Sequence, residues 1–507
     1  MKKIITIVLD GFGLRDEIEG NAVKQALMPN FNKLWDNYPC SMLEASGEAV
    51  GLPSGQFGNS EVGHMAIGAG RLVKQKEVLI DELLSTGEFA EDQDLLNAFN
   101  DIKEHNRKTH LMILCSDGGV HAQVRHLIKM LEILKEQGIT NVYLHLITDG
   151  RDTNSLSAYK YISQVKDAIN TYSIGEIATI CGRYYAMDRD NNWNRTKQYY
   201  DLITRGIGVK TNAIMNTIQT CYIKNITDEF LPPLLINEDG LIGKNDALIW
   251  LNYRTDRAKQ ILSALTNQSF DAFAVDKMPN LKLTTMFPVD KSVVHKPILD
   301  WIPIENTLGV YLSNLGMTQA RIAETEKFSH VTTFFDGEYQ KTLDNCDRYL
   351  MPSPKVATYD QAPEMAALEI CKKTISSMEK DYDFILVNFA NPDMVGHTGD
   401  MLATIKGLQA VDLCLGKIIE SAEENFYTIV LLADHGNADI MVKPDGDICT
   451  THTSSKVPFI ITDPKLELID GDLTQVAPTI LDYMDIARPK EMKETPNLFK
   501  KNKQESA

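Results

Sequence analysis

The stretch that decides the fold lies close to the amino terminus, where residues 4–11 read IITIVLDG. Six apolar or β-branched residues in a row are typical of a strand buried on both faces, as in a parallel sheet. Asp10 ends the run, and Gly11 permits a turn after it. The run is short, ends in an acidic residue and is followed by no cleavage site. We therefore interpret it as a first strand and not as a signal peptide.

Seven further runs of this kind follow along the chain. They are Leu111–Cys115, Val142–Ile147, Ile177–Cys181, Ala247–Leu251, Phe384–Ala390, Ile429–Ala433 and Val457–Ile461. Helix-period stretches separate them, and the clearest spans residues 124–134, with Gly138 predicted to end it. The alternation predicts an α/β fold of mainly parallel sheets under helices.

Composition narrows the class of protein. The 507 residues include 51 Lys and Arg against 69 Asp and Glu, a net charge of −18, which disfavours nucleic acid and anionic membranes as partners. The length suggests two to four domains. No apolar run approaches the roughly 20 residues that a membrane span needs. The eight cysteines form no CxxC motif, which favours a reducing cytoplasm over a disulfide framework.

Acidic residues follow several predicted strands. Asp10, Asp117, Asp149 and Asp434 each come directly or closely after an apolar run. Ligands of open α/β sheets bind beyond the carboxyl ends of the strands. The pattern therefore predicts a shared cation site.

Metal-ligand residue types gather in a few short segments. Beside VLDGFG at 8–13, these segments are GNSEVGH at 58–64, NPDMVGH at 391–397, ADHGNAD at 433–439 and THT at 451–453. They offer the carboxylates and imidazoles of Asp10, Asp393, Asp434, His397, His435 and His452. Oxygen and nitrogen donors without thiolate suit Mn²⁺ or Zn²⁺. Six donors exceed the need of one ion, so we expect a pair of ions of the kind used in phosphoryl chemistry.

Each segment also has an ordinary structural interpretation. Asp393 and His397 lie four apart, as on the first turn of a helix that Asn391 would cap. Asp434 and His435 could form a simple turn before Gly436. Ser60 could be a helix N-cap, or a nucleophile that a metal activates. The coincidence of all of these at strand ends favours the functional interpretation.

The same segments resemble the cofactor-independent (2,3-bisphosphoglycerate-independent) phosphoglycerate mutases, of the alkaline-phosphatase-like group. The resemblance runs from about residue 3 to residue 485, through VLDGFG, GNSEVGH, GGVHAQVRH, TDGRDT, CGRYYAMDRD, NYRTDRAKQ, AETEKFSHVTTFFDGE, NPDMVGHTG, ADHGNAD and THTSSKVPF. Departures from the family pattern occur at Met65, Ala66, Thr333, Asp336 and Glu338. None of them falls on an expected site residue.

The resemblance implies the interconversion of 3-phosphoglycerate and 2-phosphoglycerate in glycolysis and gluconeogenesis, through a phosphoserine on Ser60. It implies two Mn²⁺ ions, with Zn²⁺ or Co²⁺ possible, and no bisphosphoglycerate. One ion would be held by Asp393, His397 and His452, and the other by Asp10, Ser60, Asp434 and His435. The residues implied to bind or act on substrate are His121, Arg151, Asp152, Arg183, Arg189, Arg254, Arg257 and Lys327.

The family's organisation implies a phosphatase-like domain at residues 1–76 and 303–507, interrupted by an inserted α/β domain at 77–302. The catalytic residues would be Ser60, Asp152 and Lys327. The family also implies a monomeric, cytoplasmic enzyme of a small-molecule substrate.

The residue types suit this chemistry. Guanidinium groups pair with phosphate and carboxylate oxygens bidentately. Arg254 and Arg257 are three apart and are expected to share a helical face. The structural alternatives are surface salt bridges for the arginines, an arginine-paired Asp152, a helix-start His121, and a Lys327 paired with Glu324 or Glu326. His64 is interpreted as scaffold.

Other functions stay open at this point. A metal-dependent phosphomonoesterase or a phosphopentomutase of the same superfamily would share the metal site. GRYYAMDRD and NYRTDRAKQ favour the mutase, because they resemble the glycerate-binding set. A binding protein with a degenerate metal site is a third alternative, and the complete ligand set argues against it.

Overall fold

The computed structural model describes residues 2–300, 304–339, 341–443 and 445–500. The chain divides into two compact units, Met1–Gln75 with Pro303–Ala507 and Lys76–Ile302, each with its own buried apolar core. The predicted domain boundary at residues 302 and 303 lies outside the described residues.

The first unit is built on one sheet with strand order β12-β11-β13-β1-β14-β15-β2-β16. Its strands are β1 (Lys3–Leu9), β2 (Cys40–Glu44), β11 (Gln319–Glu324), β12 (Cys346–Met351), β13 (Phe384–Phe389), β14 (Tyr427–Leu432), β15 (Val457–Ile461) and β16 (Gly471–Asp472). Its helices are α1 (Ala22–Gln25), α2 (Pro29–Asn37), α3 (Ser60–Ala69), α13 (Leu308–Asn314), α14 (Ala367–Met378), α15 (Asn391–Gly396), α16 (Met401–Glu424) and α17 (Val476–Tyr483).

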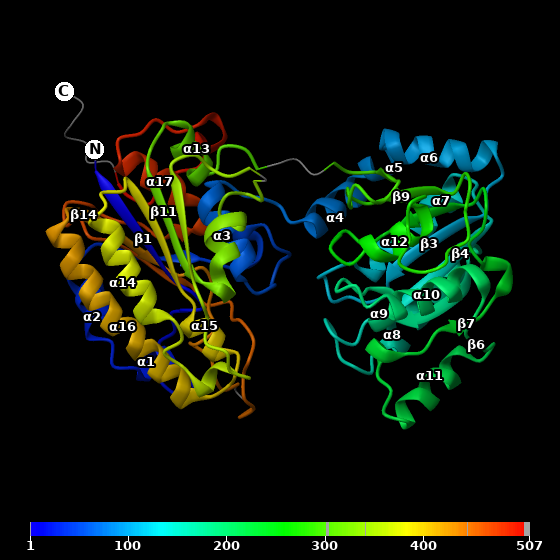
Figure 1. The fold of residues 1–507 in the computed structure, drawn as a ribbon, viewed down its shortest axis with the longest axis horizontal. Coiled ribbons are helices and arrows are strands. Elements are labelled where there is room, and N and C mark those ends of the chain that lie inside the picture. The colour runs from blue at the N-terminus through cyan, green and yellow to red at the C-terminus, as the bar shows by residue number, and fades with distance from the viewer. Residues whose placement is uncertain (1, 301–303, 340, 444, 501–507) are drawn as a thin grey trace. The chain divides into compact units, whose positions relative to one another are not determined.

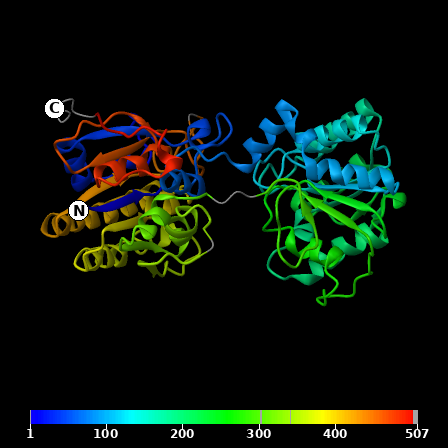
Figure 2. The same ribbon diagram turned by 90° about the horizontal axis from the view of Figure 1, so that it is seen from above.

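The central strands of this sheet are parallel. β1 pairs with β13 on one side and with β14 on the other, in both cases in parallel. β15 runs antiparallel to β14. Helices α14 and α16 lie on one side of the sheet and α3 and α17 on the other, as the two views show (Figures 1 and 2). The carboxyl ends of β1, β13 and β14 therefore meet at one edge.

The second unit has a sheet of order β10-β9-β8-β3-β4-β5-β7-β6, in which only the β5–β7 pair is antiparallel among the described strands. Its strands are β3 (Thr109–Leu114), β4 (Val142–Thr148), β5 (Glu176–Gly182), β6 (Val209–Lys210), β7 (Leu234–Leu235), β8 (Ala247–Trp250), β9 (Lys282–Thr285) and β10 (Lys296–Pro297). Its helices are α4 (Lys76–Thr86), α5 (Glu88–Glu91), α6 (Gln93–Glu104), α7 (Val124–Glu136), α8 (Ala158–Tyr172), α9 (Arg183–Ala186), α10 (Trp193–Arg205), α11 (Ile214–Ile223) and α12 (Lys259–Thr266).

The predicted α/β class is confirmed. All eight apolar runs are strands, and the predicted helix at 124–134 is α7, which ends just before Gly138. The run at Val457–Ile461 is the exception to the parallel arrangement, since β15 pairs antiparallel with both of its neighbours. Among the described residues, no helix combines the length and the apolar character that crossing a membrane requires.

A row of buried polar side chains crosses the second sheet. Nδ1 of His110 lies 3.0 Å from Nε2 of His145, whose Nδ1 is 2.8 Å from the Thr179 hydroxyl. Nε2 of His110 lies 3.1 Å from an Asp246 carboxylate oxygen. Both imidazoles are fully buried, and this burial lowers the pKa of His110 and of His145, against the opposing effect of Asp246 on His110.

We expect this row to make the second unit sensitive to acid. Unfolded histidines take up a proton near pH 6.5, whereas the folded state resists protonation. The unfolded state therefore binds more protons, so the free energy of unfolding should fall as pH drops below about 6.5, by up to about 1.4 kcal/mol per pH unit for each site. Urea unfolding at pH 7.5 and at pH 5.5, monitored by hydrogen exchange in β3 and β4, measures this free energy. His145→Gln should reduce its change between the two pH values, and His105→Gln, at an exposed histidine, should leave that change as in the wild type. An equal change in both variants would contradict the role given to the buried histidines.

Candidate metal and anion sites

The carboxyl edge of the first sheet brings three aspartates together. Asp10 follows β1, Asp393 lies in α15 directly after β13, and Asp434 follows β14. Because these strands are adjacent and parallel, their ends coincide. Gly11 permits the close approach: its φ is +77°, and a Cβ there would lie 2.7 Å from Cα of Asp393. All three carboxylates are buried.

Three imidazoles meet these carboxylates. His397 lies one turn after Asp393, and His435 follows Asp434. His452 comes from the loop before β15, whose antiparallel direction brings its amino end to the same edge. Ligand atoms of Asp393, His435 and His452 lie within 4.8 Å of one another, and so do those of Asp10, Asp434 and His435. His397 joins the first group, with Nε2 3.2 Å from Asp393 Oδ1.

Each of the three imidazoles is held by a backbone carbonyl. Nδ1 of His397, His435 and His452 lies 2.8, 3.1 and 2.8 Å from the backbone carbonyls of Thr450, Gly436 and Gly58, respectively. A carbonyl only accepts, so each Nδ1 donates, which directs Nε2 at the carboxylates. This is the arrangement by which proteins orient metal-bound histidines.

The cluster requires additional positive charge. Nε2 of His397 and Nε2 of His452 lie 3.0 Å apart, and both are 3.2 Å from Asp393 Oδ1. With neutral rings all three atoms are acceptors, so a proton or a cation must lie among them. Oδ2 of Asp434 is buried without a hydrogen-bond partner. The same demand appears at His435: burial disfavours its charged form, but Asp434 and Asp10 raise the pKa of His435 to about 9. The donor set and its charge fit divalent cations.

Ser60 presents its hydroxyl to this cluster. It is the first residue of α3, and the side chain of Asn59 caps the helix by accepting from the Val62 amide. The N-cap interpretation of Ser60 is therefore wrong, because its neighbour performs that role. Oγ of Ser60 lies 3.0 Å from Asp10 Oδ1 and 2.9 Å from His435 Nε2. The helix start thus holds a hydroxyl among potential metal ligands.

Lys327 is the cation of the cluster. It ends a 3₁₀ turn after β11, just ahead of a π-helical turn at His330–Phe334. Its ammonium donates to Asp10, Ser60 and Asp393 at 2.7, 2.6 and 2.6 Å. Burial favours the neutral amine, but the two carboxylates outweigh it and raise the pKa of Lys327. The lysine therefore pairs with the site aspartates and not with Glu324 or Glu326.

Three further side chains orient the cluster and were not predicted to do so. Asn388 donates to Asp10 at 2.7 Å, and Asn437 donates to Asp393 at 2.8 Å. His64, interpreted from sequence as scaffold, donates from Nδ1 to the Ser60 carbonyl at 2.9 Å and accepts at Nε2 from Asn388 at 3.1 Å. Its Nδ1 also lies 3.1 Å from Asp434 Oδ2, but because its proton is directed at Ser60 that oxygen still has no hydrogen-bond donor. Of the three, Asn388 could have been found from the sequence, because a polar residue inside the apolar strand FILVNF needs a buried polar partner.

The carboxyl edge of the second sheet gathers positive charge in the same way. Strands β8, β3, β4 and β5 are adjacent and parallel. Arg254 and Arg257 follow β8, and His121 follows β3. Arg151 and Asp152 follow β4, and Arg183 follows β5. Arg183 donates to Asp149 at 2.6 Å and to Asp152 at 2.5 Å. Arg189 donates to Asp256 at 2.7 Å, and Arg254 lies 3.5 Å from the same carboxylate. Asp256 was not predicted to take part. Asp117 and Asp149 were predicted to share a cation site with Asp10 and Asp434, and that prediction is wrong: both lie in the second unit, where Asp149 pairs with Arg183 and Asp117 pairs with Lys160 at 2.6 Å.

This gathering favours an anionic ligand. Burial and the adjacent Arg183 lower the pKa of His121 to about 3, and Nδ1 of His121 is buried without a hydrogen-bond partner, 3.7 Å from Asp256. Burial and the neighbouring Arg189 and Arg183 also lower the pKa of Arg257. An anion bound here would relieve the mutual repulsion of these cations. Arg151 is more than half exposed and contacts only Glu229 at ion-pair distance, 3.8 Å, among the described residues.

Two local predictions are wrong. Arg254 and Arg257 do not share a helical face, because they lie in the turn before α12, which begins at Lys259. Asn391 does not cap α15 with its side chain, which instead donates to the Pro363 carbonyl at 2.8 Å. In both places a tertiary contact replaces the expected local one: the Arg257 guanidinium donates to the Met187 carbonyl at 3.0 Å.

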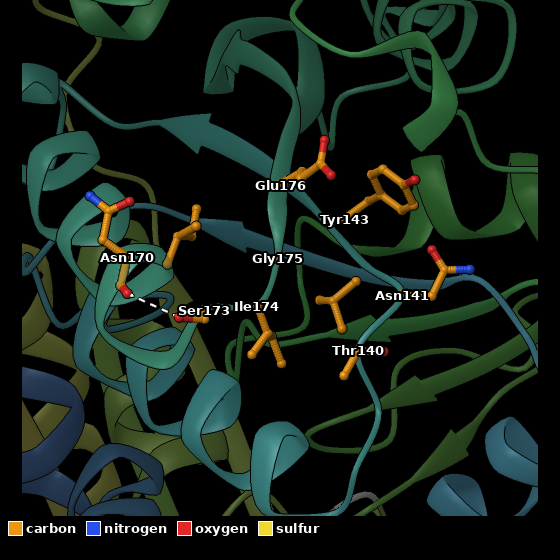
Figure 3. Close-up of a pocket in the computed structure, with 10 residues that line it drawn as sticks. Thr140, Asn141, Tyr143, Asn170, Ser173, Ile174, Gly175 and Glu176 are labelled. Carbon is orange, nitrogen blue, oxygen red and sulfur yellow. Dashed lines mark hydrogen bonds between the residues drawn. The ribbon is translucent and has the colours of Figure 1, made fainter.

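The second unit also has a polar hollow of about 370 Å³, lined by residues such as Asn141, Tyr143, Asn170 and Glu176 (Figure 3). It lies where β4 and β5 begin, which is the opposite end of these strands from the arginines. Ligands of parallel sheets bind beyond the carboxyl ends. The hollow is therefore separate from the candidate anion site.

Comparisons with known proteins agree with a metal site. A family model described as the Metalloenzyme superfamily matches residues 2–488. The chain is 44% identical over 502 residues to the 2,3-bisphosphoglycerate-independent phosphoglycerate mutase of Moorella thermoacetica, covering 97% of each chain. It is 43% identical to the enzyme of the same name from Clostridioides difficile, covering 97% of this chain and 98% of that one. A crystal structure of Leishmania mexicana phosphoglycerate mutase at low cobalt concentration matches with a TM-score of 0.76, at 27% identity and 98% coverage of both chains.

Proposed function

The chain belongs to the metalloenzyme superfamily and, within it, to the 2,3-bisphosphoglycerate-independent phosphoglycerate mutases, and we propose that it works through a phosphoserine on Ser60. It is a metal-dependent isomerase that interconverts 3-phosphoglycerate and 2-phosphoglycerate, a step of glycolysis and gluconeogenesis. The observation that carries the phosphoserine is the contact of Ser60 Oγ with Asp10, His435 and Lys327, all within 3.0 Å.

We assign one divalent ion to Asp393, His397 and His452, and the other to Asp10, Ser60, Asp434 and His435. Mn²⁺ is the proposed metal, with Zn²⁺ or Co²⁺ as substitutes for the same oxygen and nitrogen donors. When bound, such ions supply concentrated positive charge that acidifies a hydroxyl and neutralises a transferring phosphoryl group. The orphaned Asp434 oxygen and the facing Nε2 atoms of His397 and His452 support this assignment.

The side chains of the protein then divide the work. Lys327, 2.6 Å from Ser60 Oγ, stabilises the alkoxide that attacks the phosphorus of 3-phosphoglycerate. Asp152 takes the proton of Ser60, the P–O bond to Ser60 forms as the bond to the glycerate 3-oxygen breaks, and Asp152 returns the proton to that oxygen. In the second half Asp152 takes the proton of the 2-hydroxyl, the phosphoryl group moves from Ser60 to that oxygen, and the proton is returned to Ser60 Oγ. The anionic groups of the substrate are bound by His121, Arg151, Arg183, Arg189, Arg254 and Arg257.

We further propose that residues 1–76 and 303–507 form the metal and nucleophile domain, and that 77–302 form the substrate-binding domain. A monomeric, cytoplasmic enzyme is the proposed state. Eight free cysteines support the cytoplasm, since thiols persist in a reducing compartment. The net charge of −18 supports a small-molecule partner over nucleic acid or membrane.

A direct assay tests the function. With Mn²⁺ and without bisphosphoglycerate, the protein should convert 3-phosphoglycerate to 2-phosphoglycerate, measured by coupling to enolase. Little free phosphate should appear, because the phosphoryl group returns to glycerate. Phosphate as the main product would favour the phosphomonoesterase alternative. Activity on a pentose phosphate alone would favour the phosphopentomutase.

A further inference from the structure

The second unit contains a buried carboxylate that the reaction scheme leaves without a role. Glu77, the second residue of α4, is 6% exposed. Buried carboxylates are costly unless they are paired and hydrogen-bonded, so the contacts of Glu77 indicate what it stabilises. They lead to the segment GGVHAQ at 118–123, which precedes α7 and carries His121.

Glu77 holds this segment at two points. Oε1 of Glu77 accepts from the side-chain amide of Gln123 at 2.7 Å and from the guanidinium of Arg125 at 2.6 Å. Oε2 lies 3.2 Å from the hydroxyl of Tyr253, which in turn lies 2.7 Å from the Gly119 carbonyl. One carboxylate thus connects both ends of the turn around His121.

The backbone of Gly119 is adapted to this contact. Its φ is +71°, a conformation that favours glycine, and a Cβ there would lie 2.9 Å from Glu77 Oε2 and 3.0 Å from Gln123 Nε2. The glycine therefore allows the carboxylate to approach the segment closely.

The same network reaches two of the proposed substrate ligands. The carbonyl of His121 accepts from the Tyr253 amide at 2.9 Å and lies 3.4 Å from the Arg254 amide nitrogen. Tyr253 thus fixes the backbone of His121 through its amide and contacts Glu77 through its hydroxyl. The carboxylate acts on His121 and Arg254 through these intermediates, not by touching them.

We propose that Glu77 is a positioning residue for substrate binding: through Gln123 and Tyr253 it aligns His121 and Arg254 with the anionic groups of phosphoglycerate. The inference rests on the proposed function, since that function assigns His121 and Arg254 to the substrate. A purely structural Glu77 would affect the amount of folded enzyme, and a positioning Glu77 affects how tightly that enzyme holds its substrate.

The experiment is steady-state kinetics of the full-length, Mn²⁺-loaded enzyme with 3-phosphoglycerate. Glu77→Ala should raise KM by about 10-fold or more, as expected for losing hydrogen bonds to a charged group, with kcat changed less than about threefold. Glu77→Gln keeps the shape but not the charge and should give a smaller rise. Gln123→Ala should also raise KM. In the double variant with Glu77→Gln, KM should rise by less than the product of the two single fold-changes, because both substitutions break the same network.

Asp81→Asn is the matched control. Asp81 lies on the same helix and accepts from the same Arg125 at 2.9 Å. Among the described residues its hydrogen bonds are to Arg125 and His126, and none is to the segment at 118–123. Its KM should stay at the wild-type value. A lower kcat with unchanged KM in Glu77→Gln, or an equal KM rise in Asp81→Asn, would overturn the inference. A wild-type enzyme without mutase activity would instead overturn the proposed function, so the two failures are distinguishable.

Discussion

Ser60→Ala is expected to abolish the mutase reaction, lowering kcat by at least about 10⁴-fold, the scale seen when a nucleophile is removed. The hydroxyl is the group that Asp10, His435 and Lys327 converge on, and alanine leaves nothing to receive the phosphoryl group. The helix should survive the substitution, since Asn59 provides the cap of α3. The coupled assay for 2-phosphoglycerate measures the loss. Acid-quenched wild type should carry phosphate on the peptide that contains Ser60.

Ser54→Ala is the control, because Ser54 is an exposed serine of the same loop. It should retain full activity. If Ser60→Ala kept a rate within tenfold of the wild type, or if phosphate appeared on another residue, the phosphoserine on Ser60 would be wrong.

Removing divalent ions is expected to have an effect of similar size. Chelation and gel filtration should reduce activity to background, and Mn²⁺ should restore it. Loss of the ions removes positive charge from beside three buried carboxylates, of which Lys327 contacts only Asp10 and Asp393, so the thermal midpoint should also fall. The size of this fall follows from binding: an ion present at 100 times its Kd stabilises the folded protein by about 2.7 kcal/mol, and that stabilisation is lost on chelation. Elemental analysis should find two ions per chain in the restored enzyme.

The reversibility of the loss is the internal control, because a protein damaged by chelation would not recover with Mn²⁺. Full activity in a sample that elemental analysis finds free of divalent metal would contradict the assigned role of the carboxylates and imidazoles. A single bound ion would limit the assignment to one of the two ligand groups.

The sequence was sufficient to predict the eight strands with long apolar runs, but not the shorter or more polar ones such as β2, β9 and β12. It also predicted that Asp10 and Asp434 meet, because parallel strands align their carboxyl ends. It could not tell that Asp117 and Asp149, which follow strands of the same kind, belong to a different sheet. The direction of β15 was not predictable from its apolar run, because burial on both faces reads alike in parallel and antiparallel strands. The proximity of His452 to the cluster depends on that direction.

Local patterns failed where tertiary contacts outweighed them. Asn391 has the right neighbours for a helix cap, but its amide bonds Pro363, 28 residues earlier. Arg254 and Arg257 have helical spacing, but the chain turns there before α12 begins. Lys327 has two adjacent glutamates, yet its ammonium reaches Asp10, 317 positions away. No window of sequence contains such contacts.

His397, His435 and His452 are oriented by backbone carbonyl oxygens, those of Thr450, Gly436 and Gly58. Side-chain acceptors in this role can be lost by a single codon change, whereas a peptide oxygen is present whatever residue carries it. The orientation of the rings therefore depends on the path of the backbone and not on which side chains lie beside it. Sequence drift around the centre can alter its affinity for ions while leaving its geometry intact.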